Sequence, residues 1–379
     1  MVNSYLGSRA DVAIRIPLYD TVTENKQFAG DFRVALDRIL ASGRFALGNE
    51  LDTFESALAE YCGTAHAVGL KSGTDALILT LRALGIGNGD EVITTAFTFF
   101  ASVEAIMQVG ARPVFADIEP RTLCLSPDTC AAAVTPATKA ILLVHIFGHC
   151  TNVECFQSLC EDNNIALVED AAQAIGATWN GRELGSLGRA GTFSFYPTQN
   201  LSALGDAGAV VTSDEKLADS LRQLRSHGRD ATGRHVCLGY NSHMDELQAA
   251  FLHIKLGRLD AELARRRELA ARYDADLPPE ARRVHGAEGC VSNCHQYTIR
   301  TDRRDALRQF LLEQGIGTGD YYPVPAHLEP AASTAGPFPP LPETECACKE
   351  VLTLPIRPSL TDEQQRTIVD AVRRFFAGV

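Results

Sequence analysis

Residues 165–173 read Ile-Ala-Leu-Val-Glu-Asp-Ala-Ala-Gln, an apolar run that ends in two carboxylates. Such a run, without polar alternation, is typical of a strand buried on both faces of a parallel sheet. The sequence therefore predicts an α/β fold in which a mainly parallel, seven-stranded sheet is flanked by crossover helices. The other apolar runs, separated by segments of helical periodicity, cover residues 65–70, 91–95, 113–117, 140–147, 191–195 and 209–212.

The pattern changes after the last of these runs. Residues 245–274 are predicted to form one long amphipathic helix, and a strand over 296–300 and a helix over 304–314 follow it. This order is typical of a smaller α+β unit. We therefore expect a large domain with an N-terminal arm over residues 1–255 and a small domain over residues 256–379.

The composition excludes several classes of protein. The chain has 379 residues, of which 45% are hydrophobic, and its 47 acidic against 35 basic residues give a formal net charge of −12. This charge disfavours binding to nucleic acids or to anionic membranes. No apolar run approaches the roughly 18 residues of a membrane-spanning helix. We expect a globular protein with neither nucleic acid nor membrane as a partner.

Eleven cysteines are scattered through the chain, and its start lacks the charged and apolar regions of a secretory signal. Reduced thiols in the cytoplasm are therefore expected. The densest group is Cys290, Cys294, Cys346 and Cys348, whose spacings are not those of a zinc site. We expect no metal site; the alternative is that these four thiols meet in space and hold a metal or an iron–sulfur cluster.

Residues 72–77, Ser-Gly-Thr-Asp-Ala-Leu, follow a predicted strand and begin a predicted helix. A glycine turn at a helix N-terminus presents free backbone N–H groups and the positive end of the helix dipole, which suits a phosphate group. The same residues also fit an ordinary helix cap formed by Ser72. Taken alone, this motif favours the cap.

Two further motifs follow in the chain. Asp170 ends an apolar strand, at the edge where open α/β sheets bind ligands. A carboxylate there can pair with a pyridinium nitrogen and keep a pyridoxal ring electron-poor; the alternative is an aspartate that caps the next helix. Residues 191–201, Gly-Thr-Phe-Ser-Phe-Tyr-Pro-Thr-Gln-Asn-Leu, end a strand in Ser194, whose hydroxyl can bind a phosphate. The order of the three motifs is more specific than any one of them.

With these motifs the chain resembles the DegT/DnrJ/EryC1/StrS family of sugar aminotransferases, which are fold-type I pyridoxal-phosphate enzymes. The resemblance implies the fold-type I architecture and a homodimer with active sites at the subunit interface. It also implies a biosynthetic role, sometimes in antibiotic pathways, in which a keto group of a nucleotide-linked sugar or an aminocyclitol is aminated. The residues that carry it are 42–45, 48, 61–63, 72–77, 98–101, 144–149, 169–173, 193–201, 239–241, 247–250 and 354–356.

The resemblance assigns residues to the phosphate group of the cofactor, pyridoxal 5′-phosphate or pyridoxamine 5′-phosphate. Gly73, Thr74 and Ser194 would hold this phosphate. Asn241 would reach the phosphate of the cofactor bound by the partner subunit. The phosphate site is thus expected to draw on distant segments of the chain and on a second copy.

The resemblance also assigns residues to the pyridine ring and to the substrate. Phe99 would stack on the ring, Asp170 would pair with its nitrogen, and Gln173 would lie near its hydroxyl. The region around Tyr321, Tyr322 and His327 would contact the substrate.

One departure from the family bears on catalysis. The family has a lysine, which forms the Schiff base and shuttles protons, in the position of Gln199. An amide nitrogen has no basic lone pair, so it forms no imine and accepts no proton near neutral pH. We therefore expect non-covalent cofactor binding and impaired transamination. Nearby, His243 stands where the family usually has arginine, and Ala207 stands where it has glycine, which suits alanine only at a negative φ.

Three explanations of Gln199 are open: a designed substitution that traps an adduct, natural divergence with a histidine as the catalytic base, or loss of the cofactor. The leading hypothesis is a family member that binds the cofactor without a covalent tether. One alternative is a pyridoxamine-phosphate-dependent dehydratase, or a cofactor-independent enzyme in the same cleft; another is a catalytically silent partner subunit of an active paralogue. The candidate bases are His145, His149, His227, His243 and His327.

Overall fold

The computed structural model describes residues 13–378, and its centre is one large sheet. All neighbouring strands in this sheet are parallel except β9, which runs antiparallel to both of its neighbours. The predicted mainly parallel, seven-stranded sheet is therefore confirmed. Its strands, in spatial order, are β1 (His66–Leu70), β9 (Gly208–Thr212), β8 (Ala190–Ser194), β5 (Ala166–Asp170), β4 (Thr138–Val144), β2 (Glu91–Thr95) and β3 (Arg112–Ala116).

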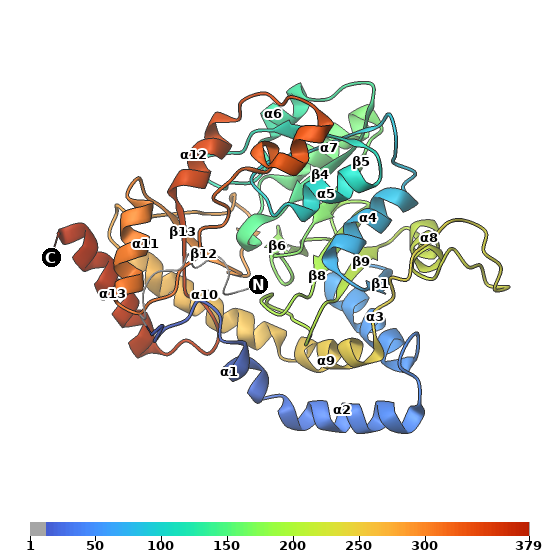
Figure 1. Cartoon of the computed structure of the whole chain (residues 1–379), viewed down its shortest axis with the longest axis horizontal. Helices are drawn as coiled ribbons and strands as arrows, with labels where there is room; N and C mark the ends of the chain where they lie inside the picture. The colour runs from blue at the N-terminus through green and yellow to red at the C-terminus, as the bar shows by residue number, and fades with distance from the viewer. Residues whose placement is uncertain (1–12, 379) are drawn as a thin grey trace.

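Helices cover both faces of this sheet (Figure 1). One face packs against α3, α7 and α9, and the other against α4, α5 and α8. Neighbouring residues of one strand point to opposite faces of the sheet. Leu143 packs in the cluster that contains α3, α7 and α9, and Leu142 packs in the cluster that contains α4 and α5. This double burial explains the continuous apolar runs. The helices are α3 (Asn49–Cys62), α4 (Gly73–Ala83), α5 (Ala101–Gln108), α6 (Pro127–Ala132), α7 (Val153–Asn163), α8 (Glu215–Arg225) and α9 (Glu246–Leu256).

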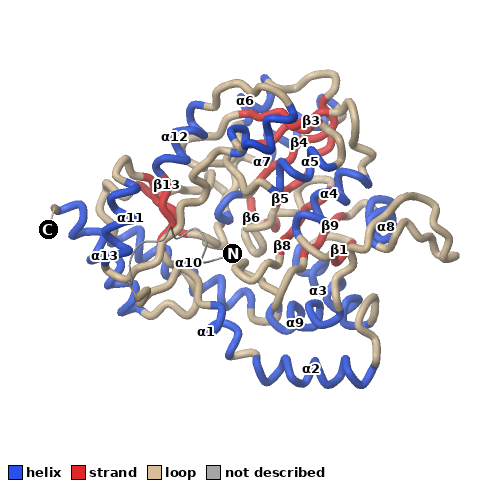
Figure 2. The backbone as a smooth tube through the Cα atoms, in the orientation of Figure 1, coloured by secondary structure: helices blue, strands red, loops and turns tan. Residues whose placement is uncertain are grey.

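The C-terminal part has its own antiparallel sheet, in the order β10-β12-β13, and its own buried cluster. Figure 2 shows β13 well apart from the strands of the large sheet. The expected strand over 296–300 and helix over 304–314 are confirmed as β12 and α11. The elements are α10 (Leu259–Asp276), β10 (Arg282–Arg283), β12 (Tyr297–Arg300), α11 (Arg304–Glu313), α12 (Pro342–Glu350), β13 (Val351–Leu354) and α13 (Asp362–Ala377).

The prediction of a single long helix over residues 245–274 is wrong. The structure has two helices there, α9 and α10, separated at Gly257 and Arg258. The N–H groups of both residues donate to the carbonyl oxygen of Lys255, which tightens and ends the last turn of α9. Glycine has a low helix propensity, and the apolar periodicity concealed this break. The domain boundary near residue 255, and with it the ranges 1–255 and 256–379, stays a prediction.

Short elements connect these layers. Helix α2 runs along the outside of α9, and α1 lies beside the junction of α9 and α10 (Figure 1). A three-stranded sheet in the order β11-β6-β7 joins the C-terminal part to the segment that follows β5. No helix among residues 13–378 is both long and apolar enough to cross a membrane. The remaining elements are α1 (Thr21–Lys26), α2 (Ala29–Ser42), β6 (Thr178–Trp179), β7 (Arg182–Glu183), β11 (Cys290–Val291), and the 3₁₀ helices η1 (Ile146–Gly148), η2 (Ala326–Leu328) and η3 (Pro330–Ala335).

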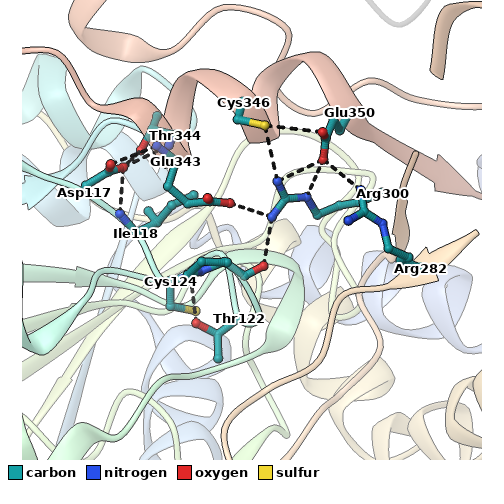
Figure 3. Close-up of polar contacts among 11 residues, drawn as sticks. Asp117, Ile118, Thr122, Cys124, Arg282, Arg300, Glu343, Thr344, Cys346 and Glu350 are labelled. Atoms are coloured by element: carbon teal, nitrogen blue, oxygen red, sulfur yellow. Dashed lines mark hydrogen bonds and ion pairs between the residues drawn. The ribbon is translucent and has the colours of Figure 1, made fainter. Parts of the chain in front are cut away.

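A polar network ties α12 to both parts of the chain (Figure 3). The carboxylate of Asp117, just beyond β3, accepts hydrogen bonds from the backbone N–H groups of Glu343 and Thr344, each at 2.9 Å. The guanidinium of Arg300 lies between Glu343 (2.6 Å) and Glu350 (2.9 Å) and also donates to the carbonyl of Pro120 at 2.9 Å. Arg300 therefore joins β12 to α12 and to the loop after β3.

Replacing this arginine is expected to destabilise the protein more than replacing an exposed arginine that contacts the same carboxylate. The Arg300 side chain is 10% exposed, whereas that of Arg282, 3.2 Å from Glu350, is 59% exposed. Because Arg300→Met leaves Glu343 unpaired and leaves Glu350 with only the exposed Arg282, it should lower the free energy of unfolding by about 2–4 kcal/mol. Arg282→Met should lower it by less than about 1 kcal/mol. Urea unfolding measures both, and equal effects would contradict this account of the network.

Candidate active site

The side chain of Asp170 is the central buried acid of the site. It lies at the carboxyl end of β5 and is 5% exposed. One carboxylate oxygen accepts a hydrogen bond from Ser102 Oγ at 2.7 Å and the other accepts from the N–H of Ala172 at 3.2 Å. Thr98 Oγ1 lies 2.9 Å from Ser102 Oγ. Burial raises the pKa of Asp170 and outweighs these hydrogen bonds, which lower it.

The preceding residue, Glu169, has a structural role, because its carboxylate binds neighbouring backbone and a buried histidine. Its carboxylate accepts hydrogen bonds from the N–H groups of Gly185 (2.8 Å), Leu187 (2.6 Å) and Gly188 (2.6 Å). The ring nitrogen Nε2 of His145 lies 2.9 Å from it, and both side chains are fully buried. Glu169 thus holds the turn formed by residues 185–188, and its contact with His145 ties the residue after β4 to β5.

Gln173 links the end of β5 to the C-terminal part. Its Oε1 accepts a hydrogen bond from the N–H of Phe147 at 2.6 Å, and its Nε2 donates to the hydroxyl of Tyr322 at 3.3 Å. The ring centroid of Tyr322 lies 6.0 Å from that of Phe99, which is 60% exposed. Burial raises the pKa of Tyr322. The structure therefore brings together Gln173 and Phe99, two of the residues predicted to surround a cofactor ring.

The predicted phosphate turn meets two other segments of the chain. Ser72 caps α4, because its hydroxyl accepts a hydrogen bond from the N–H of Asp75 at 3.0 Å. A Cβ added to Gly73 would lie 2.6 Å from Cβ of Ser194, and one added to Gly208 would lie 2.5 Å from the nitrogen of Gly73. Only glycine allows these close approaches. Ser72 thus caps α4, as the first interpretation of the motif predicts. Gly73 also lies against Ser194, as the phosphate-site interpretation requires.

Residues 241–243 lie along the same turn. The N–H of Lys71, an exposed residue, donates to the carbonyl of Ser242 at 3.0 Å, and Ser242 Oγ donates to Asp75 at 2.5 Å. Backbone pairing places His243 beside the end of β1. Nδ1 of His243 is buried without a hydrogen-bond partner, and Asn241 is exposed. Thr74, the second residue of α4, is partly buried.

Gln199 lies in the loop that follows β8. Its N–H donates to the carbonyl of Tyr196 at 2.8 Å, and the loop returns to the strand where the N–H of Ala203 donates to Phe195 at 2.8 Å. The amide oxygen Oε1 of Gln199 is buried and has no hydrogen-bond partner. Ala207, on the far side of this loop, has no positive φ, so its Cβ fits without strain.

The two residues predicted to contact substrate have different surroundings. Tyr321 is partly exposed and shares a hydrogen bond with Tyr19. The side chain of His327 is only 2% exposed; its ring lies 6.0 Å from that of Phe115 and its Nε2 lies 3.4 Å from Glu345. The loop from 321 to 327 therefore presents Tyr321 and keeps His327 in its interior.

Known proteins resemble this chain in both sequence and structure. The model of the DegT/DnrJ/EryC1/StrS aminotransferase family matches residues 27–373. The chain belongs to this family. The dTDP-3-amino-3,4,6-trideoxy-alpha-D-glucose transaminase of Streptomyces venezuelae is 43% identical over 98% of each chain. A crystal structure of S. venezuelae DesV in complex with a ketimine intermediate matches with a TM-score of 0.92 at 43% identity, covering 95% of this chain and 98% of that one. NtdA of Bacillus subtilis with bound cofactor PMP matches with a TM-score of 0.88 at 31% identity, covering 98% and 86%.

The predicted family and fold are therefore confirmed, and the homologues are sugar aminotransferases. For this family member, sequence reasoning missed two contributors to the site. Ser102 donates a hydrogen bond to Asp170, and Asn293 donates one through Nδ2 to the carbonyl of Gln173 at 2.9 Å. Tyr322, predicted only as part of the substrate region, also contacts the Gln173 side chain. Only Ser102 had a local signal, since it lies four residues after Thr98 at the start of a helix.

The buried histidines differ in what they can do as bases. Burial lowers the pKa of His149 to about 3 and that of His295 to about 3, so both rings are neutral at pH 7. His295 Nδ1 lies 3.3 Å from Asn200 Oδ1, next to Gln199. His227 has a positive φ of 60° in an exposed loop. Of the five candidate bases, His243 combines partial exposure with an unpartnered ring nitrogen.

Acid should destabilise the fold through His295. Its pKa falls from 6.5 to about 3 on folding, so the stability it contributes is complete above pH 6.5 and is lost as the pH falls toward 3. His295→Gln removes this proton site; relative to the unmodified protein, the variant should gain about 2–3 kcal/mol in free energy of unfolding between pH 7.5 and pH 4.5. Urea unfolding at both pH values measures this. His235→Gln, at an exposed histidine, should show no such change; a pH-independent difference for His295→Gln would contradict the assignment.

The cysteines are all free thiols. Cys294 belongs to the core of the C-terminal part, whereas Cys348 packs with Phe97 and Phe147 in another cluster. Cys346 donates to Glu350 at 3.3 Å (Figure 3). Among residues 13–378, no three His, Cys, Asp or Glu side chains are placed to hold a metal ion. The alternative of a metal held by the four C-terminal cysteines therefore has no support in the described structure.

Proposed function

We propose that this protein binds pyridoxal 5′-phosphate or pyridoxamine 5′-phosphate non-covalently and acts on a nucleotide-linked keto or amino sugar, or an aminocyclitol, in biosynthesis. The observation that carries the proposal is the buried carboxylate of Asp170, which is 5% exposed and has no cationic partner among its hydrogen bonds. A pyridinium N–H would supply that partner. The names of the relatives, which include transaminases of dTDP-linked sugars, support the sugar class.

The residues present fit such a cofactor. The contact between Gly73 and Ser194 leaves the N-terminus of α4 facing the serine hydroxyl without an intervening side chain. Backbone N–H groups of Gly73 and Thr74 would bind the phosphate there, assisted by the helix dipole. When bound, the ring withdraws electrons from the substrate carbon that gives up its proton. Asp170 would keep the ring nitrogen protonated and so sustain that withdrawal.

The remaining site residues would position the ring and the substrate. Phe99, exposed at the carboxyl edge of the sheet, would cover one face of the ring. Gln173 would orient the ring hydroxyl, since its amide is held at both ends. We place Tyr321 at the substrate, and His327, which is buried, supports the loop that carries Tyr321. Asn241, exposed on this chain, would reach the cofactor of a second copy.

Gln199 limits what the site can catalyse. Its unpartnered Oε1 can accept a hydrogen bond from an amine, but the amide cannot take up a proton near neutral pH. Transamination is therefore expected to be slow, and the buried oxygen favours the amine form of the cofactor. His243, beside the end of β1, is the residue we propose as a substitute base.

We further propose a cytoplasmic homodimer. The eleven free thiols are typical of a reducing compartment. Several large apolar side chains are exposed, among them Phe99 after β2, as expected of a surface that a second copy covers. Sedimentation equilibrium should give twice the chain mass; a monomer would contradict this proposal. The exposed apolar side chains include Phe45 (54%), Leu47 (47%), Phe99 (60%), Tyr196 (41%), Leu204 (44%), Leu238 (96%) and Tyr240 (38%).

Calorimetric titration with each cofactor form tests the proposed function. We expect one site per chain for pyridoxamine phosphate and for pyridoxal phosphate, with no mass increase after borohydride treatment because Gln199 cannot attach the aldehyde. Addition of a nucleotide-linked keto sugar to the pyridoxamine-phosphate complex should then give slow amino transfer. Absence of binding to either form would overturn the proposal.

A further inference from the structure

Two thiols far apart in the sequence meet beside the site. Cys150 follows η1, Cys290 begins β11, and the thiol of Cys150 donates a hydrogen bond to the sulfur of Cys290. The backbone fixes this contact, since the N–H of Ala287 donates to the carbonyl of Cys150 at 2.9 Å and the N–H of Cys290 donates to Ala287 at 3.0 Å. A Cβ on Gly286 would lie 2.7 Å from Sγ of Cys290, so only glycine leaves room for that sulfur.

The two sulfurs differ in chemistry. The thiol and the backbone N–H of Cys150 both donate to Cys290, which holds the pKa of Cys290 below its usual range despite burial. The same contact, together with burial, raises the pKa of Cys150. Cys290 is partly exposed, whereas Cys150 is fully buried. An accessible sulfur of thiolate character beside a protonated partner is the arrangement of a reactive and a resolving cysteine.

We propose that Cys290 and Cys150 are a redox-active pair that hydrogen peroxide converts to a disulfide, and that this disulfide regulates the neighbouring site. The Cys290 thiolate attacks one peroxide oxygen, the O–O bond breaks, hydroxide leaves and takes up a proton, and Cys290 becomes a sulfenic acid. The Cys150 sulfur then attacks the Cys290 sulfur, the S–O bond breaks, and the Cys150 proton leaves with the oxygen as water. Two thiols and one peroxide thus yield one disulfide and two waters.

Both thiol-bearing segments hold Gln173, which connects the pair to the site. Phe147, three residues before Cys150, donates its N–H to the Gln173 side chain at 2.6 Å. Asn293, three residues after Cys290, donates through Nδ2 to the Gln173 carbonyl at 2.9 Å, and its own carbonyl accepts from Asn200 at 3.3 Å. A disulfide draws the two sulfurs from hydrogen-bonded contact to covalent distance. The two segments that clasp Gln173 must therefore shift.

Peptide mapping tests the pair itself. In a background of Cys155→Ser and Cys237→Ser, which removes the exposed thiols, peroxide-treated protein is denatured, alkylated and digested. We expect one peptide pair linked through Cys150 and Cys290, which dithiothreitol separates and which is absent from a Cys290→Ser variant. Recovery of both cysteines as alkylated thiols, or of Cys290 as an unlinked sulfinic acid, would overturn the proposal.

Hydrogen exchange on the cofactor-free protein tests the coupling to the site. The amide of Phe147 should exchange at least about fivefold faster in the disulfide form, and dithiothreitol should reverse this. Unchanged exchange in cross-linked protein would overturn the regulation. The regulatory role rests on the proposed function, so the same samples are titrated with pyridoxamine phosphate. If reduced protein binds none, the proposed function fails, whereas the pair and its coupling are still decided by mass and exchange.

Discussion

Replacing Gln199 by lysine is expected to convert a non-covalent cofactor site into a covalent one. The side chain in this position is partly buried in the loop after β8, and its terminal oxygen lacks a partner, so an ammonium group has room and an unfilled polar position there. Gln199→Lys supplies an amine that can bond to the aldehyde of pyridoxal phosphate and can also carry a proton. Amino transfer from a nucleotide-linked amino sugar should rise by about 10²–10⁴-fold.

Intact-protein mass after borohydride reduction measures the attachment, and coupled assay of amino transfer measures the rate. Gln199→Met, which has a similar length and no amine, should show neither effect and is the matched control. If Gln199→Lys binds pyridoxal phosphate as the unmodified protein does but gains neither mass nor rate, then residue 199 does not face the reacting end of the ring. In that case, the base of the site would be His243 or another group, and not residue 199.

Replacing Asp170 by asparagine should have opposite effects on cofactor affinity and on the stability of the cofactor-free protein. Burial raises the pKa of Asp170, so its ionised form is disfavoured in the fold; the stability cost grows as the pH rises above the carboxyl's unfolded value. Asp170→Asn removes that cost and should leave the melting temperature at pH 7.5 equal or higher. It also removes the partner of the ring nitrogen, so pyridoxamine phosphate should bind about 10²–10³-fold more weakly.

Ser102→Ala separates these two effects. It removes one hydrogen bond to the carboxylate, 2.7 Å long, and leaves the negative charge in place. We expect a loss of affinity of about tenfold and a lower melting temperature, because the buried carboxylate then lacks a donor. Calorimetry and thermal unfolding at pH 7.5 measure both variants. Unchanged affinity in Asp170→Asn would show that Asp170 does not bind the ring nitrogen.

The prediction of the fold succeeded where local pattern and tertiary burial coincide. The run that becomes β5 is apolar on both sides because one face packs on α7 and the other on α4 and α5. Burial of both faces gives consecutive apolar residues, which the sequence shows directly. The prediction failed at Gly257, where continued apolar periodicity concealed the end of α9. Periodicity reports which face is buried, and it does not report whether the helix axis continues.

The features of the site also fall into those that the local sequence indicates and those that it does not. The three motifs could be recognised locally, because a phosphate turn, a strand-ending acid and a serine strand are each short and each follow from one element. The contact between Gly73 and Ser194 and the clasp on Gln173 formed by Phe147 and Asn293 could not. These contacts join segments whose separation in the chain leaves no periodic signal.

From the amino-acid sequence alone follow the layered α/β fold and the family, together with the predictions made for Asp170 and Gln199, because each depends on short-range residue order. Only the tertiary structure decided that Ser102 holds that acid, that His327 is buried, and that Cys290 meets Cys150 rather than its neighbours in sequence. The physical reason is that hydrogen bonds and thiol contacts depend on distances of a few ångströms between atoms. The folding of the whole chain brings these atoms together, and residue spacing along the chain does not record it.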